Sequence, residues 1–320
     1  MAGHHQHNHI DPTAGDRRVV AAIAVNLTLT FVQVVGGALA GSLALIADAL
    51  HNFSDAVALI IAYAARKISR RDADGSMTFG YGRIEVVAAL INYTTLIVLG
   101  LYLVYEAILR FIQPQGVDGW LVVAIAGVAL VVDVITAALT FVLSKSSMNI
   151  RAAFLHNVAD ALGSVAVIIA GTLIILFDWR LIDPLVTLLI AIYILWMAFS
   201  EIGSAIRILM LGSPKNVDTC DVMDSVRSID GVTSVHHAHF WLMEERASAF
   251  DAHLVIDEGA WSRADAIKEM VRTKLREGFG IEHTTLELEC TFHTCDDPIV
   301  IGHRRITDNG ASRHHEDESL

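Results

Sequence analysis

Six long apolar runs constrain this chain more than any other feature of its sequence. A run of about 20 mostly apolar residues can cross the hydrocarbon core of a bilayer as a helix. Very short connections near residue 40 and at 178–181 predict tight hairpins between neighbouring helices. We therefore predict membrane-spanning helices at residues 19–39, 43–65, 84–111, 119–144, 150–177 and 181–208.

The composition agrees with a membrane protein. Hydrophobic residues make up 54% of the chain and the mean hydropathy is +0.51, whereas soluble domains are about 45–50% apolar. The net charge of −12 argues against nucleic acid as a partner. The polar start of the sequence shows no pattern of a cleavable signal. The cysteines, Cys220, Cys290 and Cys295, form no even disulfide framework, which favours reduced thiols in a cytoplasm.

Basic residues gather at one end of the predicted spans. Cytoplasmic loops of membrane proteins carry an excess of Lys and Arg, so this end should face the cytoplasm together with both chain termini. The opposite end offers only Arg110 and Arg180. The residues at the basic end are Arg17, Arg18, Arg66, Lys67, Arg70, Arg71, Arg83, Lys145, Arg151, Arg207 and Lys215.

After Leu211 the sequence changes to the pattern of a small soluble domain. A helical period is followed by two alternating strand-like segments, an amphipathic helix with Ser262 as its N-cap, and a third strand-like segment. The order α-β-β-α-β predicts two helices on one face of a three-stranded sheet. We expect a His-rich cytoplasmic segment, a six-helix membrane domain, a cytoplasmic metal-binding-like α+β domain and a polar, disordered tail, at residues 1–17, 18–210, 211–297 and 298–320.

Two of the apolar runs contain the same ionisable pair, His-x-x-x-Asp. The pairs are His51 with Asp55 and His156 with Asp160. A spacing of four residues places both side chains on one face of a helix, and ionisable groups inside a membrane are costly enough to indicate function. If the two helices touch, two imidazoles and two carboxylates converge, which suits a tetrahedral Zn²⁺ site.

Other polar residues in the spans admit two interpretations. Asp48 is either a proton-linked acid lining a cavity or a hydrogen-bond partner of a neighbouring helix. Asn26 could face the site from the first helix or bond across helices, and Asp133 is a candidate for the cavity wall. Asp183 precedes Pro184 at the start of the sixth span, where it is expected to cap that helix.

The paired motifs, the six spans and the α-β-β-α-β domain together resemble the cation diffusion facilitator family over residues 18–297. Local stretches such as "GSLALIADALHNFSD" and "FGYGRIEVVAALIN" carry the same resemblance. The family implies proton-coupled export of divalent metal from the cytoplasm by a homodimer that alternates its access. The four His and Asp residues match its central transport site in the form associated with zinc. The bacterial inner membrane is the expected location.

The resemblance also implies metal binding in the cytoplasmic domain. The matching positions are His236, His253 and Glu289. Neighbouring candidates are His239, His283, Cys290, His293 and Cys295. Among them, Cys290, His293 and Cys295 form a Cys-x-x-His-x-Cys pattern. Thiolate with imidazole favours Zn²⁺. This zinc would be regulatory, bound in addition to the zinc that is transported.

Two further features bear on metal capture. The loop between the second and third spans holds a metal site in some family members, but here it has no histidine and offers only Asp72 and Asp74. We therefore expect no site there. The amino-terminal histidines could instead raise the local metal concentration at the cytoplasmic entrance. They are His4, His5, His7 and His9.

The sequence thus predicts a proton-coupled exporter of divalent cations, with Zn²⁺ as the main substrate. Cd²⁺, Co²⁺, Ni²⁺ or Fe²⁺ as the main substrate is an alternative. A second alternative is a membrane-anchored metal sensor that binds the same ion without moving it. An intramembrane metalloprotease is excluded, because the spans lack a His-Glu-x-x-His pattern and four protein ligands leave no position for catalytic water.

Overall fold

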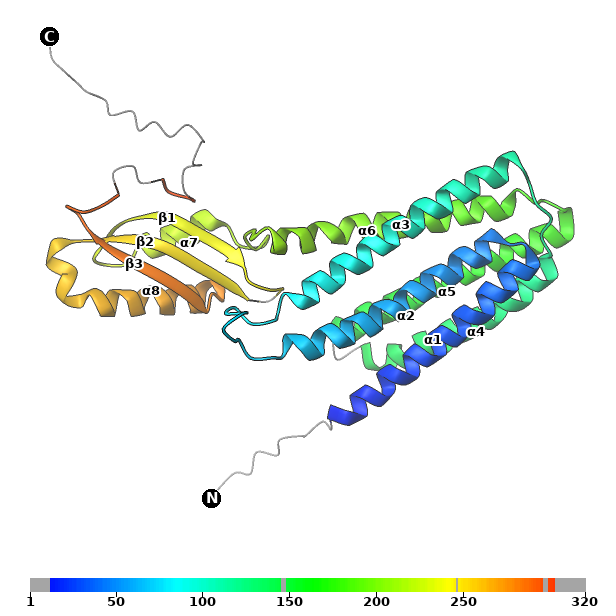
Figure 1. Cartoon of the computed structure of the whole chain (residues 1–320), viewed down its shortest axis with the longest axis horizontal. Coiled ribbons are helices and arrows are strands. Elements are labelled where there is room, and N and C mark those ends of the chain that lie inside the picture. Colours follow the sequence, from blue (N-terminus) through cyan, green and yellow to red (C-terminus); the bar gives the residue numbers. More distant parts are fainter. Residues whose placement is uncertain (1–11, 145–147, 246, 296–298, 303–320) are drawn as a thin grey trace, which may run out of the picture. The chain divides into compact units, whose positions relative to one another are not determined.

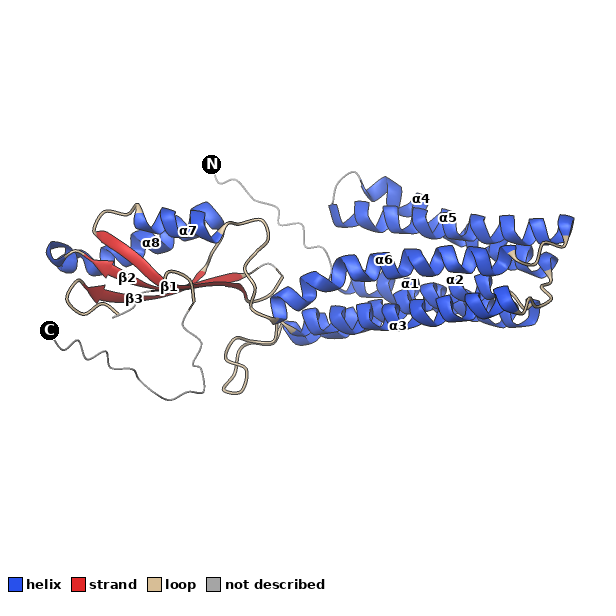
Figure 2. Cartoon of the chain, turned by 90° about the horizontal axis from the view of Figure 1, so that it is seen from above, coloured by secondary structure: helices blue, strands red, loops and turns tan. Residues whose placement is uncertain are grey.

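The computed structural model describes residues 12–144, 148–245, 247–295 and 299–302. The side chains that lie outside this description within its helices are those of residues 12–23, 59, 139–144 and 148–157. The chain forms two compact units, Met1–Ile206 and Arg207–Leu320. Figures 1 and 2 show a helical first unit, and a second unit built from a small sheet and short helices.

The first unit is a bundle of long helices that run side by side (Figure 1). They are α1 (Pro12–Ala40), α2 (Leu43–Ser69), α3 (Ile84–Ile112), α4 (Gly119–Ser144), α5 (Met148–Phe177) and α6 (Ile182–Leu209). Five of the described helices are long and apolar enough to cross a membrane, and α1 contributes a shorter apolar stretch, Ala24–Ala40. The predicted helical membrane domain is confirmed. Helix α1 begins before the predicted span, at Pro12, a residue suited to a first helical position.

Helix α2 lies between two buried apolar clusters. The first, called here the turn-end cluster, lies close to the α1–α2, α3–α4 and α5–α6 turns and contains Ala40, Ala44, Leu45, Val122, Ala126, Val167, Ala170 and Val186. The second joins α2 to α3 and α6 through Leu43, Ala47, Leu96, Leu103, Ala107, Ala191, Ile194 and Ala198. Half of the members are alanine, which lets the helix backbones approach closely. Both clusters therefore fix the position of α2.

A glycine contact shows how close this approach is. A Cβ atom placed on Gly171 would lie 2.8 Å from Val123 Cγ2 and 3.1 Å from the Gly119 carbonyl oxygen. These distances leave no room for a side chain, so α4 and α5 pack backbone against backbone here. Gly171 thus permits close helix contact, as expected of a glycine within a membrane span.

The second unit contains α7 (Thr219–Arg227), β1 (Val232–Leu242), β2 (Ser248–Ile256), a 3₁₀ helix η1 (Glu258–Arg263), α8 (Ala264–Phe279) and β3 (His283–Cys290). The sheet order is β1-β2-β3, with β1 and β2 antiparallel and β2 and β3 parallel. Figure 2 shows α7 and α8 on the same face of the sheet. Apolar residues of both helices, such as Val222 and Leu275, pack against Phe250 and Leu254. The predicted α-β-β-α-β order is confirmed.

Strand β1 contains an irregularity that affects the other face of the sheet. The pairing with β2 shifts between His236 and His239, and His237 has a φ of +50°. The segment after β3 returns to the outer edge of β1, where the His237 N–H donates to the Ile299 carbonyl at 2.8 Å. Ala238 and Ile301 form a parallel bridge there. The bulge is therefore covered on its open edge.

Two predicted helix caps are wrong. Ser262 lies inside η1, so α8 begins after Arg263 without a side-chain cap. Asp183 lies in the first turn of α6, but its carboxylate accepts hydrogen bonds from the start of α2. In both cases the sequence shows a suitable residue, whereas the cap depends on which backbone N–H groups the fold brings near it.

Candidate metal sites

The membrane unit gathers three of the four predicted transport ligands. His51 and Asp55 lie one turn apart on α2, and the His51 Nε2 atom is 3.7 Å from Asp55 Oδ2. Asp160 reaches the same imidazole from α5, with its Oδ1 atom 3.3 Å from His51 Nε2. One ligand atom from each of these residues lies within 4.8 Å of the other two. Two helices therefore bring one nitrogen and two carboxylate ligands to a common point.

The fourth predicted ligand, His156, belongs to α5, one helical turn before Asp160. Its side chain lies outside the described residues, so its part in the site stays a prediction. The spacing of four residues predicts that it shares a face of α5 with Asp160. With His156 the donor set would be two nitrogens and two oxygens, which suits tetrahedral Zn²⁺.

These ligands are mostly buried. The side chains of His51, Asp160 and Asp55 are only 7%, 12% and 19% exposed. The ring of Tyr193 on α6 meets the His51 ring edge-on, with 6.5 Å between their centres. Sequence reasoning missed Tyr193, because a tyrosine in an apolar span has no spacing that marks it as a neighbour of a ligand.

A buried polar network lies beside the site, between α1 and α2. Gln33 donates a hydrogen bond from Nε2 to Asp48 Oδ2 at 2.6 Å, and it accepts one from Asn52 at 3.0 Å. All three side chains are buried. Asp48 thus has a hydrogen-bond partner on a neighbouring helix, while its role with protons stays a prediction. Gln33 was missed, although an amide within an apolar run is itself a sign of a buried network.

The cavity roles predicted for Asp133 and Asn26 stay predictions. Asp133 on α4 is buried and accepts a hydrogen bond from Ser164 on α5 at 2.9 Å. Asn26 is half-buried on α1. In the loop after α2, the Asp74 carboxylate accepts bonds from Ser76 and from the Tyr81 hydroxyl, so it organises the loop.

A second cluster forms on the helix-free face of the sheet in the second unit. His236, His253 and Glu289 come from β1, β2 and β3, so three adjacent strands each supply one side chain. The Glu289 Oε1 atom is 2.6 Å from His253 Nδ1, and its Oε2 atom is 3.2 Å from His236 Nε2. Glu287 adds a second carboxylate 3.3 Å from His253 Nε2. The three positions matched by resemblance thus lie together.

Cys295 and His237 extend this cluster. The Cys295 Sγ atom lies 3.7 Å from His237 Nδ1 and 3.8 Å from His253 Nδ1. One ligand atom from each of His236, His237, His253 and Cys295 falls within 4.8 Å of the others. His237 was missed, because in a regular strand it would point to the face opposite His236. The bulge in β1 removes that alternation.

In the sheet cluster, the pKa shifts of His236 and Glu289 favour the protonation states that bind a metal ion. Burial lowers the pKa of His236, and the nearby Glu289 carboxylate only partly opposes this. Burial acts to raise the pKa of Glu289, but hydrogen bonds from His253 and Cys295 outweigh it and leave the pKa low. A neutral imidazole beside an ionised carboxylate is the state that binds a cation. The buried His236 Nδ1 atom has no hydrogen-bond partner among the described residues, which fits a ligand position.

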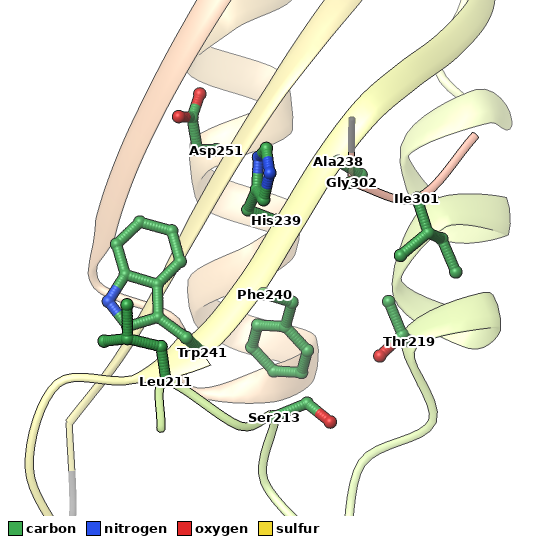
Figure 3. Close-up of a pocket in the computed structure, with 10 residues that line it drawn as sticks. All are labelled: Leu211, Ser213, Thr219, Ala238, His239, Phe240, Trp241, Asp251, Ile301 and Gly302. Carbon is green, nitrogen blue, oxygen red and sulfur yellow. The ribbon is translucent and has the colours of Figure 1, made fainter. Parts of the chain in front are cut away.

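Four candidates, Cys290, His293, His283 and His239, lie outside this cluster. The Cys290 Sγ atom is 3.0 Å from His293 Nδ1, and this contact lowers the pKa of the Cys290 thiol. His283 is exposed at the start of β3. His239 lines a separate cavity of about 410 Å³ with Asp251 and Trp241, as Figure 3 shows. The amino-terminal His4, His5, His7 and His9 lie outside the described residues.

Comparison with known proteins agrees with both units. A model described as the cation efflux transmembrane domain matches residues 19–210. A second model, the cytoplasmic domain of cation efflux proteins, matches residues 214–290. The chain belongs to the cation diffusion facilitator family. It is therefore a membrane transporter and not an enzyme, and its second unit is the cytoplasmic domain of this transporter.

Curated relatives match the transporter over nearly its whole length. The "Cadmium, cobalt and zinc/H(+)-K(+) antiporter" of Bacillus velezensis is 34% identical over 97% of this chain and 99% of its own. The "Metal cation efflux system protein CzcD" of Cupriavidus metallidurans is 33% identical over 97% of this chain and 100% of its own. The "Zinc transporter ZitB" of Escherichia coli is 34% identical over 98% of this chain and 100% of its own.

Proposed function

We propose that this transporter exports Zn²⁺ in exchange for protons and that His51, Asp55, His156 and Asp160 bind the ion during transport. The observation that carries the proposal is the meeting of His51, Asp55 and Asp160, all mostly buried, from two helices of the bundle. Relatives named as zinc transporters and as a cadmium, cobalt and zinc antiporter support the ion class. Cd²⁺ and Co²⁺ are the alternative substrates that these names favour.

Competition between metal and protons supplies the coupling. Zn²⁺ needs neutral imidazoles and ionised carboxylates, so binding releases protons and protonation expels the ion. Histidine suits this exchange because its unperturbed pKa of about 6.5 lies near working pH. In the inward-facing state the site loads metal from the cytoplasm, and in the outward-facing state it takes up protons. The net cycle moves metal out and protons in.

We further propose that both termini lie in the cytoplasm of a bacterial cell, in its inner membrane. In the sequence, eleven basic residues flank the predicted spans on one side, against Arg110 and Arg180 on the other, and this asymmetry supports the orientation. The α1–α2, α3–α4 and α5–α6 turns then face away from the cytoplasm. The match of the second unit to a cytoplasmic domain is consistent with this assignment.

In the cytoplasmic domain, we propose a regulatory Zn²⁺ site formed by His236, His253, Glu289 and Cys295, with His237 as a further ligand. Imidazole, carboxylate and thiolate together are a donor set that zinc accepts. We also propose that the transporter works as a homodimer. Metal in this domain would then bias the transport equilibrium without lying on the transport path.

Zinc flux into proteoliposomes with an imposed pH gradient tests the transport proposal. We expect Asp160→Ala to abolish flux, because it removes an anionic ligand, and Asp178→Ala to leave flux unchanged, because Asp178 is an exposed acid paired with Arg180. His156→Ala should match Asp160→Ala. Undiminished flux in Asp160→Ala would rule out the four-ligand site, and binding without flux in the unaltered protein would favour a sensor.

A further inference from the structure

The start of α2 is held by a carboxylate from another helix. Asp183 on α6 accepts hydrogen bonds from the Leu43 N–H at 2.8 Å, from the Ala44 N–H at 3.3 Å and from the Ser42 hydroxyl at 2.5 Å. The Asp183 side chain is only 1% exposed. A helix start has unpaired N–H groups and a partial positive charge, so a buried carboxylate there binds firmly. The contact ties α2 to α6.

Arg110 at the end of α3 completes the group. Its Nη1 atom donates a hydrogen bond to the Gly41 carbonyl and lies 3.6 Å from Asp183 Oδ2. Gly41, in the turn between α1 and α2, has a φ of +69°, which a residue with a side chain rarely adopts. The α1–α2 turn, α3 and α6 therefore meet at one buried ion pair.

The turn-end cluster lies between this ion pair and the transport ligands. Leu45 is fully buried in that cluster, and His51 is six residues further along α2, about 9 Å deeper at 1.5 Å per residue. Apolar contacts are non-directional. The hydrogen bonds to Asp183 are directional, so they add a specific contact to the apolar packing that holds α2 against α6.

We propose that Asp183, Ser42 and Arg110 form a latch that closes the turn end of the transport path, and that the latch opens when metal leaves. Asp183 is a positioning residue in this scheme, since it acts on the metal through α2 and not by contact. Movement of α2 away from α6 would separate Leu45 from Val186 and open the turn-end cluster. The inference goes beyond the proposed metal site and rests on the proposed function, because it assumes both metal transport past His51 and the proposed orientation.

Labelling of a single reporter cysteine in intact cells tests the latch. Leu45→Cys serves as the reporter, with a membrane-impermeant maleimide added outside; the native cysteines belong to the cytoplasmic domain. We expect slow labelling of Leu45→Cys alone. Adding Asp183→Asn or Arg110→Gln should raise the labelling rate about tenfold, because each weakens the closed state and raises the population of the open one. Adding Asp178→Asn, the matched control, should change nothing.

Two further variants test the orientation and the contribution of the Ser42 hydroxyl. Asp178→Cys, at an exposed position, must label from outside; if it labels only in inside-out vesicles, the orientation is wrong and the comparison is repeated from that side. Ser42→Ala removes one hydroxyl contact and should raise labelling less than Asp183→Asn. A purely structural role for Asp183 would lower the melting temperature without raising labelling of the folded protein. Equal labelling in all latch variants would overturn the proposal.

Discussion

The cluster around His51 and the cluster around His253 both combine imidazole with carboxylate, and the second adds the Cys295 thiol, but they are assembled by different secondary structure. In the membrane, the side chains come from separate helices, α2 and α5, that pack through small residues. In the cytoplasmic domain, adjacent strands joined by backbone hydrogen bonds position them. Helices can shift relative to each other at little cost, whereas strands of one sheet cannot. The first arrangement therefore suits release of an ion and the second suits its retention.

The largest expected effect separates the two clusters directly. His51→Ala should reduce zinc flux by at least about 100-fold, because a buried ligand has no substitute. His253→Ala should change the flux by no more than about threefold, since the role proposed for that site is regulatory. Flux in proteoliposomes measures both. Total loss of flux in His253→Ala would show that the cytoplasmic cluster is part of the transport mechanism.

Removal of Gln33 should have the next largest effect. Gln33→Leu leaves Asp48 without its donor and Asn52 without its acceptor, and each unsatisfied buried group costs about 1–3 kcal/mol. We expect a lower melting temperature, measured in detergent on the full chain. Thr172→Val, which removes an exposed hydroxyl bonded within its own helix, is the control. An unchanged melting temperature would mean that water replaces the amide.

The two cysteines near the end of β3 sharpen the definition of the cytoplasmic cluster. Cys295→Ser should weaken zinc binding to the full-length transporter about tenfold, because it exchanges a thiolate ligand for a hydroxyl. Cys290→Ser should leave that affinity unchanged, since Cys290 contacts His293 instead. Calorimetry on the His51→Ala background isolates this site. The reverse pattern would place the metal at the Cys290 and His293 pair.

The smallest effect concerns the two histidines that flank Ala238. His237→Gln should lower the affinity of the same site by about threefold, and His239→Gln should not, because only His237 joins the cluster. The same calorimetric assay compares them. Equal losses in both variants would mean that the bulge rearranges when metal binds.

The sequence predicts the residues of the membrane cluster more directly than those of the cytoplasmic cluster, for physical reasons. Four-residue spacing defines one face of a helix, so His51 and Asp55 are recognisable as a pair from the sequence alone. Alternation defines the faces of a strand only while the strand is regular, and the bulge in β1 brings His237 to the face that alternation denies it. Regular geometry is thus readable from spacing, while local irregularity is not.

Contacts between distant segments were also beyond prediction. Gln33 and Asp48 are close in space because α1 and α2 pack antiparallel after a tight turn, and Asp183 reaches α2 from 140 residues away. Each residue type is compatible with several partners, and only the assembled helices select one. The fold class itself was predictable, since apolar run lengths and the α-β-β-α-β order depend on local sequence.

The return of the chain from Cys295 to the far edge of β1 has a mechanical consequence. The sheet has β3 at one margin and β1 at the other, and the backbone of Ile299–Ile301 is bonded to the latter. An ion held jointly by His236, His253 and Glu289 would link all three strands, and Cys295 would add the segment that follows β3. The rate of amide hydrogen exchange in β3 would then fall as the zinc concentration in the cell rises.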